Sequence, residues 1–308
     1  MPPKRQSFGP RSLSAVGAIS SLERDWRDYL ILTKPDISFL VSISTLAGFV
    51  LGSPAPVSWF KLLATILGTT LAAAGACALN HAVEADRDAR MKRTASRPVA
   101  AGRLTSRQAY AFGLSAVVVS VSWLCPTVNP LTAILAAVTV VLYVYVYTPL
   151  KSRTSWNTVV GTIPGALPAL GGYVAATNDL FSPVGWSLFL VLAFWQLPHF
   201  YSLAWMYRKD YGRGDFRMIS VADDSGRHTA LAAVVGSVAL VLATAVPFLL
   251  HAASVWYLAG ATLLGLWLLY KTVQFARERS AVAARTLLKA SILYIPVYVA
   301  LLVVDHVL

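Results

Sequence analysis

Charge is scarce in this sequence: only 13% of its 308 residues are Asp, Glu, Lys or Arg, about half the share in a soluble domain. Apolar residues make up 56% and form blocks of about twenty, the length of a helix that crosses roughly 30 Å of hydrocarbon. A soluble globular protein is therefore excluded, and we expect a polytopic membrane protein. The blocks lack the short alternation of barrel strands, so all-α spans are predicted.

Cysteine and acidic residues are also few. Two cysteines, at positions 77 and 125, have no spacing typical of a metal site or a disulfide framework. Fourteen acids against 26 Lys and Arg give a formal charge of +12. In a chain this apolar, such an excess indicates biased loops between spans and not a nucleic-acid partner.

Nine apolar blocks bounded by Pro, Gly or charge predict nine transmembrane helices. The predicted spans are residues 37–53, 59–80, 108–125, 129–148, 156–177, 184–206, 229–250, 252–270 and 287–307. If the spans alternate in direction, 25 of the 26 basic residues lie on one side of the membrane, and Lys61 is the exception. The positive-inside rule then makes the N-terminus cytoplasmic.

The same count sets the expected organisation. We predict a cytoplasmic N-terminal tail over residues 1–28 and one transmembrane domain over 29–308 in a bacterial inner membrane. The N-terminal stretch is basic, rich in Ser and free of acids until Glu23, which is also typical of a mitochondrial presequence. The mitochondrial inner membrane is therefore the alternative location.

A stretch rich in acids follows the second span on the cytoplasmic side. If that helix continues through Asp88, a turn of 100° per residue places Asn80, Glu84 and Asp88 within an arc of about 80°, with Asp86 on the far side. Neighbouring carboxylates repel unless a cation lies between them, and Mg²⁺ prefers oxygen ligands. The stripe predicts a Mg²⁺ site.

Basic residues follow this stripe. Arg93 and Arg97 suit the oxygens of a diphosphate. The alternative is a solvated loop in which the acids pair locally, Glu84 with Arg87 or Asp88 with Lys92.

Two further polar sets lie at the same membrane face. His199 and Asp210 close the sixth span, eleven residues apart, which in one helix would put them about 16 Å apart on nearly the same face. An ionisable residue inside a span predicts a functional site, and the alternative is a neutral His satisfied by a neighbouring helix. Tyr147 and Lys151 end the fourth span, where ordinary snorkelling of the lysine is the alternative.

The motifs together resemble a known family, the haem O synthases or protohaem IX farnesyltransferases of the UbiA superfamily of intramembrane prenyltransferases. The resemblance runs from about residue 28 to the end. It is carried by Leu32-Thr-Lys34-Pro35, Asn80-x3-Glu84-x-Asp86-x-Asp88-x2-Met91-x-Arg93-Thr94-x2-Arg97-Pro98, Tyr147-Thr-Pro-Leu-Lys151, Trp195-Gln-Leu-Pro-His199-Phe and Asp210-Tyr211.

The resemblance implies transfer of farnesyl from farnesyl diphosphate to a vinyl group of haem b, with a hydroxyl added to give haem O and with Mg²⁺ as cofactor. It also implies that the nine helices form a bundle around a central cavity. It matches Asn80, Glu84 and Asp88 to a metal motif, Lys151 to a diphosphate-binding lysine and His199 to a haem-side histidine. The implied partners are the lipid bilayer, haem b, farnesyl diphosphate, and haem A synthase or proteins that assemble terminal oxidases. The chain departs from the superfamily pattern at His81, where Asp is usual, and keeps Asp210 alone of a second run of aspartates.

Ionising an allylic diphosphate requires charge stabilisation at the leaving oxygens and shielding from water. We expect four metal ligands: Asn80, Glu84, Asp88 and Asp210. The expected catalytic residues are these four together with Lys151 and His199. Four cations are expected on the diphosphate: Lys34, Arg93, Arg97 and Lys151. The expected haem and prenyl pocket consists of Tyr147, Trp195, His199 and Tyr201.

Two other functions fit parts of this pattern. A prenyltransferase of the same architecture acting on a quinone precursor is disfavoured by His199 and the Arg-Thr-x2-Arg-Pro element. A transporter would place polar or broken segments near the bilayer midplane in two repeats, whereas these charges gather at one face.

Overall fold

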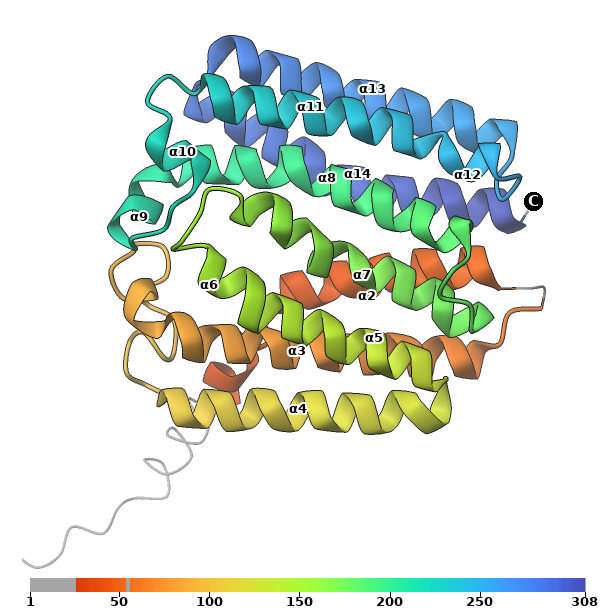
Figure 1. The fold of residues 1–308 in the computed structure, drawn as a ribbon, viewed down its shortest axis with the longest axis horizontal. Helices are drawn as coiled ribbons and strands as arrows, with labels where there is room; N and C mark the ends of the chain where they lie inside the picture. Colours follow the sequence, from red (N-terminus) through yellow and green to blue (C-terminus); the bar gives the residue numbers. More distant parts are fainter. Residues whose placement is uncertain (1–25, 54–55, 308) are drawn as a thin grey trace, which may run out of the picture.

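The computed structural model describes residues 26–53 and 56–307, and within them nine helices are long and apolar enough to cross a membrane (Figure 1). This confirms the all-helical, nine-span prediction. The spans are α2 (Pro35–Gly52), α3 (Trp59–Asp88), α4 (Ser106–Thr127), α5 (Pro130–Val141), α7 (Asn157–Thr177), α8 (Pro183–Met206), α11 (Arg227–Thr244), α13 (Val255–Glu278) and α14 (Ala281–Val307). The protein is a multi-pass membrane protein.

Two spans are extended by short elements, and two more short helices lie in a connection. The α5 span continues through the π-helical turn η1 (Leu142–Tyr147) into α6 (Thr148–Leu150), and α11 is followed by α12 (Val246–Leu249). Helices α9 (Arg208–Arg213) and α10 (Ile219–Ala222) lie between α8 and α11.

Short polar side chains begin several helices by accepting otherwise unpaired backbone N–H groups. Thr105 and Gln108 form a reciprocal capping box at the start of α4. The Asn129 side chain accepts from the N–H of Thr132 at 2.8 Å, just before Pro130 starts α5. These local signals decide where the helices begin.

The helix ends differ from the predicted boundaries on the polar side. Helix α3 runs to Asp88 and not to residue 80, α13 ends at Glu278 and not at 270, and α14 begins at Ala281 and not at 287. Hydropathy detects only the apolar part of a helix, and polar turns that extend beyond it carry no such signal. The predicted tail, residues 1–28, lies outside the described residues up to position 25, and the single domain over 29–308 stays a prediction.

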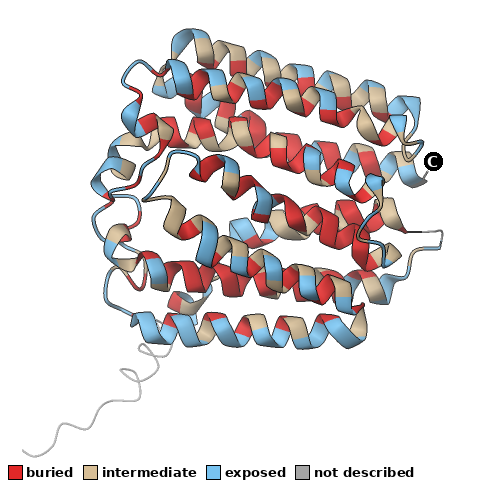
Figure 2. Cartoon of the chain, viewed as in Figure 1, coloured by how far each residue is buried: buried red, intermediate tan, exposed pale blue. Residues whose placement is uncertain are grey.

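Buried residues gather in the centre of the bundle, and exposed residues lie along its edges (Figure 2). In α7, 72% of an 18-residue stretch is buried, against 28% in α4 and in α13, which lie at opposite edges in Figure 1. Helix α7 packs against α2 and α8, and α3 packs against α4. Large apolar side chains such as Val118, Val119 and Leu263 are exposed along the edge helices, so these edges face lipid.

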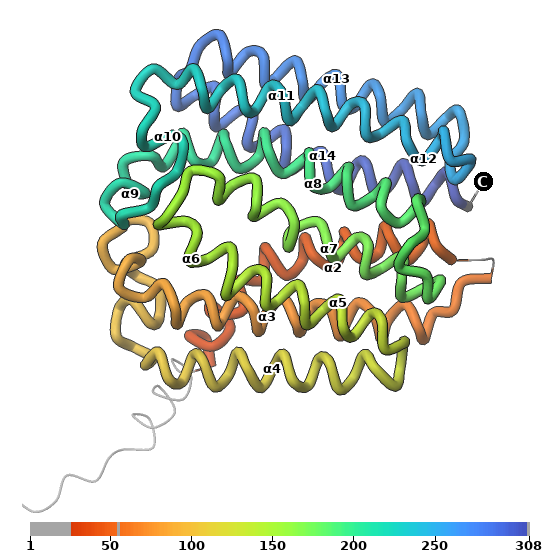
Figure 3. Tube along the Cα trace, in the orientation of Figure 1, coloured from red at the N-terminus to blue at the C-terminus, as the bar shows by residue number. Residues whose placement is uncertain are grey.

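The connections 89–105, 151–156 and 207–226 meet at one end of the bundle, which we call the charged end (Figure 3). An ion pair joins Arg90 to Asp215, and Arg87 donates to the Asp215 carbonyl at 3.2 Å. The N–H of Arg217 donates to the Lys151 carbonyl at 2.7 Å. These bonds tie three separate connections into one ordered cap over the helix ends.

Two adjacent glycines on α7 test the packing of the bundle. A Cβ added to Gly172 would lie 2.0 Å from the Thr45 carbonyl oxygen of α2, whereas at Gly171 it would meet no atom within 4 Å. We expect Gly172→Ala to lower the melting temperature, because forced overpacking costs about 1–3 kcal/mol. Gly171→Ala should leave it unchanged or slightly raised. Thermal unfolding of both variants in detergent checks this, and equal melting temperatures would contradict the described contact of α2 with α7.

Candidate functional site

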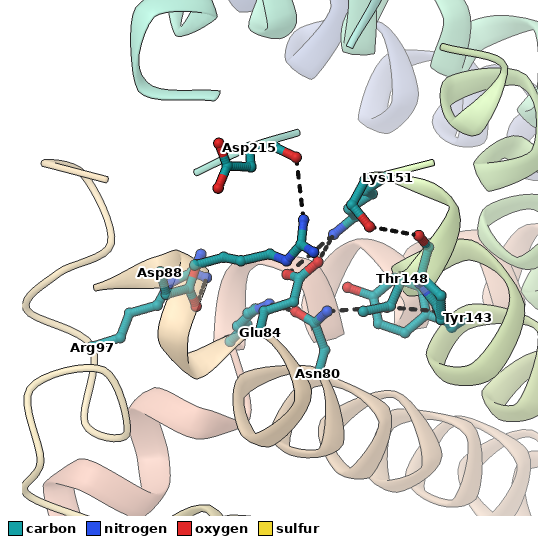
Figure 4. Close-up of polar contacts among 12 residues, drawn as sticks. Asn80, Glu84, Asp88, Arg97, Tyr143, Thr148, Lys151 and Asp215 are labelled. Atoms are coloured by element: carbon teal, nitrogen blue, oxygen red, sulfur yellow. Dashed lines mark hydrogen bonds and ion pairs between the residues drawn. The ribbon is translucent and has the colours of Figure 1, made fainter. Parts of the chain in front are cut away.

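A stripe of three polar side chains on α3 lies buried at the charged end (Figure 4). Asn80, Glu84 and Asp88 are each 5% exposed or less, while Asp86 is exposed. The helix continues through Asp88 without a break, so residues four apart share one face. The structure therefore brings the three residues of the predicted stripe together and leaves Asp86 outside.

Each member of the stripe is held by a cation from a different part of the chain. The Lys151 ammonium donates to both Glu84 carboxylate oxygens, at 3.0 and 3.3 Å. Arg97 donates to Asp88 Oδ2 at 2.7 Å. Lys34 Nζ donates to Asn80 Oδ1 at 2.8 Å. The alternative of local pairs with Arg87 and Lys92 is therefore wrong for Glu84 and Asp88.

The end of the fourth span is shaped to reach this stripe. Pro149 has no N–H to give to a helix ladder, and the chain before it widens into the π-helical turn η1, a form often found at functional sites. Thr148 Oγ1 donates to the Tyr143 carbonyl at 2.9 Å and accepts from Asn80 Nδ2 at 3.1 Å. The wide turn thus joins the fourth span to α3 next to Lys151.

Lys34 occupies a strained backbone position. Its φ of 45° is left-handed, which costs a residue with a side chain about 1–2 kcal/mol, and Pro35 follows directly. Strain of this kind persists where surrounding structure holds the residue in place. Here the contact with Asn80 across the gap between α2 and α3 does so.

The two lysines differ in their ease of protonation. Burial lowers the pKa of Lys34 to about 8, and the nearby positive charges of Arg97 and Lys151 act in the same direction. Burial alone would lower the pKa of Lys151 too, but the Glu84 carboxylate outweighs it and holds that pKa above its usual value. Lys151 therefore stays charged at neutral pH.

A cavity of about 70 Å³ lies over the stripe, with charged walls. Its charged lining residues are four cations and two carboxylates: Lys34, Arg93, Arg97 and Lys151 with Glu84 and Asp88. The excess of positive charge is suited to a bound anion. Aromatic rings support the cations, since Lys151 Nζ lies 4.7 Å from the centre of the Tyr147 ring and Arg93 lies over the rings of Tyr207 and Tyr211.

A second cavity, of about 410 Å³, extends from the first between α2, α3, α5, α7 and α8. Its walls are mostly apolar, and small residues such as Ala72, Ala76 and Gly171 make the hollow. Six residues line both cavities: Lys34, Arg93, Tyr147, Lys151, Tyr211 and Met218. A single site therefore has a charged mouth and an apolar interior.

Helix α8 contributes polar and aromatic side chains to the large cavity. His199, Trp195 and Gln196 line it, and the Trp195 ring stacks on His199 with centroids 5.1 Å apart. Gln196 donates to the Thr162 carbonyl at 3.1 Å and is thereby fixed against α7. The predicted pocket residues Tyr147, Trp195 and His199 are thus brought to one cavity.

Two other predicted residues are not. Tyr201 is 4% exposed and belongs to the core that α8 shares with α11, α13 and α14. It does not line the cavity, because two residues further along the helix its side chain points about 200° away from that of His199. Helix α8 ends at Met206, so the helical spacing from His199 to Asp210 does not apply. Asp210 accepts from Arg213 and from the Arg93 N–H and lines neither cavity; its role as a metal ligand stays a prediction.

Some lining residues carried no sequence signal. Phe216 and Met218 come from the irregular connection after α9, and Leu203 comes from α8. Only the tertiary arrangement selects such residues from the many apolar ones in the chain. Thr148, by contrast, sits within the Tyr-Thr-Pro-Leu-Lys motif and was open to detection.

Residues 41–293 match the UbiA prenyltransferase family. The chain belongs to the UbiA prenyltransferase family. A protein of Salinibacter ruber named protoheme IX farnesyltransferase is 54% identical to this UbiA chain over 279 residues, covering 90% of this chain and 98% of that protein. A protein of the same name from Solibacter usitatus is 43% identical over 91% of this chain and 99% of its own length. The mitochondrial one of Arabidopsis thaliana is 35% identical over 96% of this chain and 68% of its own length.

Solved structures share the UbiA fold. A structure described as that of digeranylgeranylglyceryl phosphate synthase superposes with a TM-score of 0.75 at 15% identity, covering 92% of this chain and 99% of its own. A UbiA homologue from Archaeoglobus fulgidus, bound to GPP and Mg²⁺, gives a TM-score of 0.60 at 16% identity, covering 89% of this chain and 99% of its own. At such low sequence identity, these superpositions show a shared fold and nothing more.

The buried pair of Glu84 and Lys151 provides a stability test. Lys151→Met should lower the free energy of unfolding by about 3–5 kcal/mol, because it leaves a buried carboxylate without its counter-ion. The double variant Glu84→Gln/Lys151→Met should be more stable than Lys151→Met alone. Arg213→Met, which breaks the more exposed pair with Asp210, is the control and should cost less than about 1 kcal/mol. Denaturation in detergent measures the parent and the three variants, and a Lys151→Met variant as stable as the parent would disprove the coupling.

Proposed function

We propose that this protein transfers the farnesyl group of farnesyl diphosphate to a vinyl group of haem b and so makes haem O. The observation that carries the proposal is the cavity over Asn80, Glu84 and Asp88, which has more positive than negative wall residues and opens onto an apolar cavity of about 410 Å³ containing His199. A diphosphate suits the first part, and a farnesyl chain with a porphyrin suits the second. The names of the bacterial relatives point to the same substrates.

The residues present fit a Mg²⁺ ion shared with substrate. Asp88 Oδ1 is buried and has no hydrogen-bond partner among the residues that the structure describes, so it is available to accept a cation. Among the residues that the structure describes, no three His, Cys, Asp or Glu side chains gather closely enough to hold a metal by themselves. Mg²⁺ typically takes one or two carboxylates together with substrate phosphates and waters. We infer that Asp88, Glu84 and Asn80 hold it jointly with the diphosphate, with Asp210 as an outer candidate.

The cations of the charged mouth act on the leaving group. When the bond between C1 of farnesyl and its oxygen breaks, the electron pair stays with the diphosphate and adds negative charge to it. Three cations that line the cavity stabilise this negative charge: Lys34, Lys151 and Arg93. Arg97 holds Asp88 in place and adds to the same field. The bound Mg²⁺ supplies Lewis-acid stabilisation of the same oxygens.

The apolar interior protects and directs the cation that forms. The Tyr147 ring lines both cavities and offers a π-face beside the diphosphate end. Apolar walls limit water near the allylic cation until the vinyl group attacks C1. The positive charge then left on the haem side chain takes the oxygen of a water molecule, which loses a proton, and a hydroxyl results. His199, which lines this cavity, is proposed to hold the porphyrin for this step.

The location and partners follow as proposals from charge and chemistry. We propose a bacterial inner membrane with the charged end and N-terminus on the cytoplasmic side, where 25 of 26 basic residues would gather. Haem A synthase and proteins that assemble terminal oxidases are the proposed recipients of the product. Transfer to a quinone precursor remains the second candidate function, because a charged mouth and an apolar cavity would serve it as well.

A direct assay tests the proposal. Purified protein in detergent is incubated with haem b, farnesyl diphosphate and Mg²⁺, with and without a chelator, and extracted porphyrins are analysed by mass. We expect a Mg²⁺-dependent product heavier than haem b by a farnesyl group plus hydroxyl. Unmodified haem, with farnesyl transferred instead to an aromatic quinone precursor, would overturn the choice of acceptor. Metal-independent movement of a solute across vesicles would favour a transporter.

The two aspartates flanking Arg87 form a matched pair for the metal proposal. Asp88→Asn should reduce turnover at least about 100-fold and weaken its Mg²⁺ dependence, because the buried oxygen without a partner is lost as an anionic ligand. Asp86→Asn makes the same change on the exposed face of α3 and should leave turnover within about twofold. Titrating Mg²⁺ against initial rate compares them, and identical profiles would remove Asp88 from the metal site.

A further inference from the structure

Outside the cavity walls, one residue of α14 holds the histidine that faces the cavity. Ser291 Oγ lies 2.9 Å from His199 Nδ1. Ser291 is fully buried, and no described residue of α14 lines either cavity. The contact therefore reaches His199 from behind, across the packed interface of α8 with α14.

The direction of this hydrogen bond follows from a second contact of the serine. Ser291 Oγ also lies 2.7 Å from the Leu288 carbonyl oxygen, which can only accept. A hydroxyl has one proton, so while Ser291 donates it to that carbonyl, its oxygen accepts from His199. The His199 proton then sits on Nδ1, and Nε2 of the neutral ring keeps a free lone pair.

The other ring nitrogen is left for the cavity. Among the described residues, His199 Nε2 has no hydrogen-bond partner, and the ring lines the large cavity. An unprotonated imidazole nitrogen is a preferred ligand of iron. In metalloproteins, the ring N–H opposite the metal is held by an acceptor that fixes the tautomer and the ring orientation.

Ser291 also fixes the ring that packs on the histidine. Its backbone carbonyl accepts from Trp195 Nε1 at 2.8 Å, and the Trp195 and His199 rings are stacked with an interplanar angle of 28°. Ser291 thus holds two side chains that lie one helical turn apart on α8, Trp195 through its carbonyl and His199 through its hydroxyl. Rotation of either ring would break one of these contacts.

We infer that Ser291 is a positioning residue, which holds His199 with Nδ1 protonated so that Nε2 is directed into the cavity as an axial ligand of the iron of haem b. This inference rests on the proposed function for the identity of the porphyrin. It assigns to α14, which lines neither cavity within the described residues, a role in presenting the acceptor. The hydroxyl acts only through His199 and touches no substrate.

Spectroscopy of bound haem tests this role separately from turnover. Parent, Ser291→Ala and Ser291→Thr are titrated with haem b, and the Soret band and the iron–histidine stretch in resonance Raman spectra are recorded. Ser291→Ala should bind haem about 10-fold more weakly and shift the stretch to lower frequency, since the ring loses its acceptor. Ser291→Thr keeps the hydroxyl and should restore the stretch.

A buried serine elsewhere provides the control. Ser237 is also fully buried, and its hydroxyl contacts Thr272 at 2.8 Å in the interface of α11 with α13, away from both cavities. Ser237→Ala should bind haem as the parent does. An equal loss of haem affinity in Ser291→Ala and Ser237→Ala would mean that Ser291 contributes only to packing, and it would overturn the inference.

The parent alone supplies a test that does not depend on a variant folding. Its iron–histidine stretch should be present with ferrous haem b and absent in His199→Gly. No such stretch in a parent that still makes haem O would overturn the inference and leave the proposed function intact. A histidine-ligated haem that responds to Ser291→Ala in a protein that forms no haem O would instead support the inference and defeat the proposed function.

Discussion

An ionised carboxylate that leaves water needs a counter-ion or a cation, because its burial alone costs several kcal/mol. At the end of α3 this requirement draws distant parts of the chain together. Glu84 pairs with Lys151, directly after the fourth span, and Asp88 pairs with Arg97 in the connection after α3. Lys34 reaches Asn80 from the start of α2. The charged mouth, the wide turn η1 and the ordered connections over the helix ends all depend on these pairings.

The cavity below that mouth depends on a different constraint, the close approach of helix backbones. Gly48 and Gly172 leave no room for a Cβ where α2 meets α7, so these helices pack tightly on one side of the site. On the cavity side, Ala72, Ala76 and Gly171 leave space where larger side chains would fill the bundle. Small residues therefore do two opposite things in α7: Gly172 brings helices together, and Gly171 keeps a hollow open.

Much of the fold and part of the site could be predicted from local pattern. Twenty-residue apolar blocks predicted nine spans, and helical periodicity predicted that Asn80, Glu84 and Asp88 share a face, because both depend on chemistry within one segment. The extrapolation from His199 to Asp210 was wrong, because it assumed one unbroken helix across Tyr207. The placement of Tyr201 at the cavity was wrong because its neighbours on α11, α13 and α14 are invisible in its own segment.

The sequence by itself determined that the protein lies in a lipid bilayer, where its spans are, on which side its charges gather and which residues form the polar stripe. Hydropathy and spacing suffice for this because they are properties of short segments. Only the tertiary structure decided which cation meets which carboxylate, which apolar residues line the cavity and that Ser291 lies behind His199. The partners in these contacts are between 9 and 92 residues apart in the chain. Their meeting follows from the packing of whole helices, which no single segment encodes.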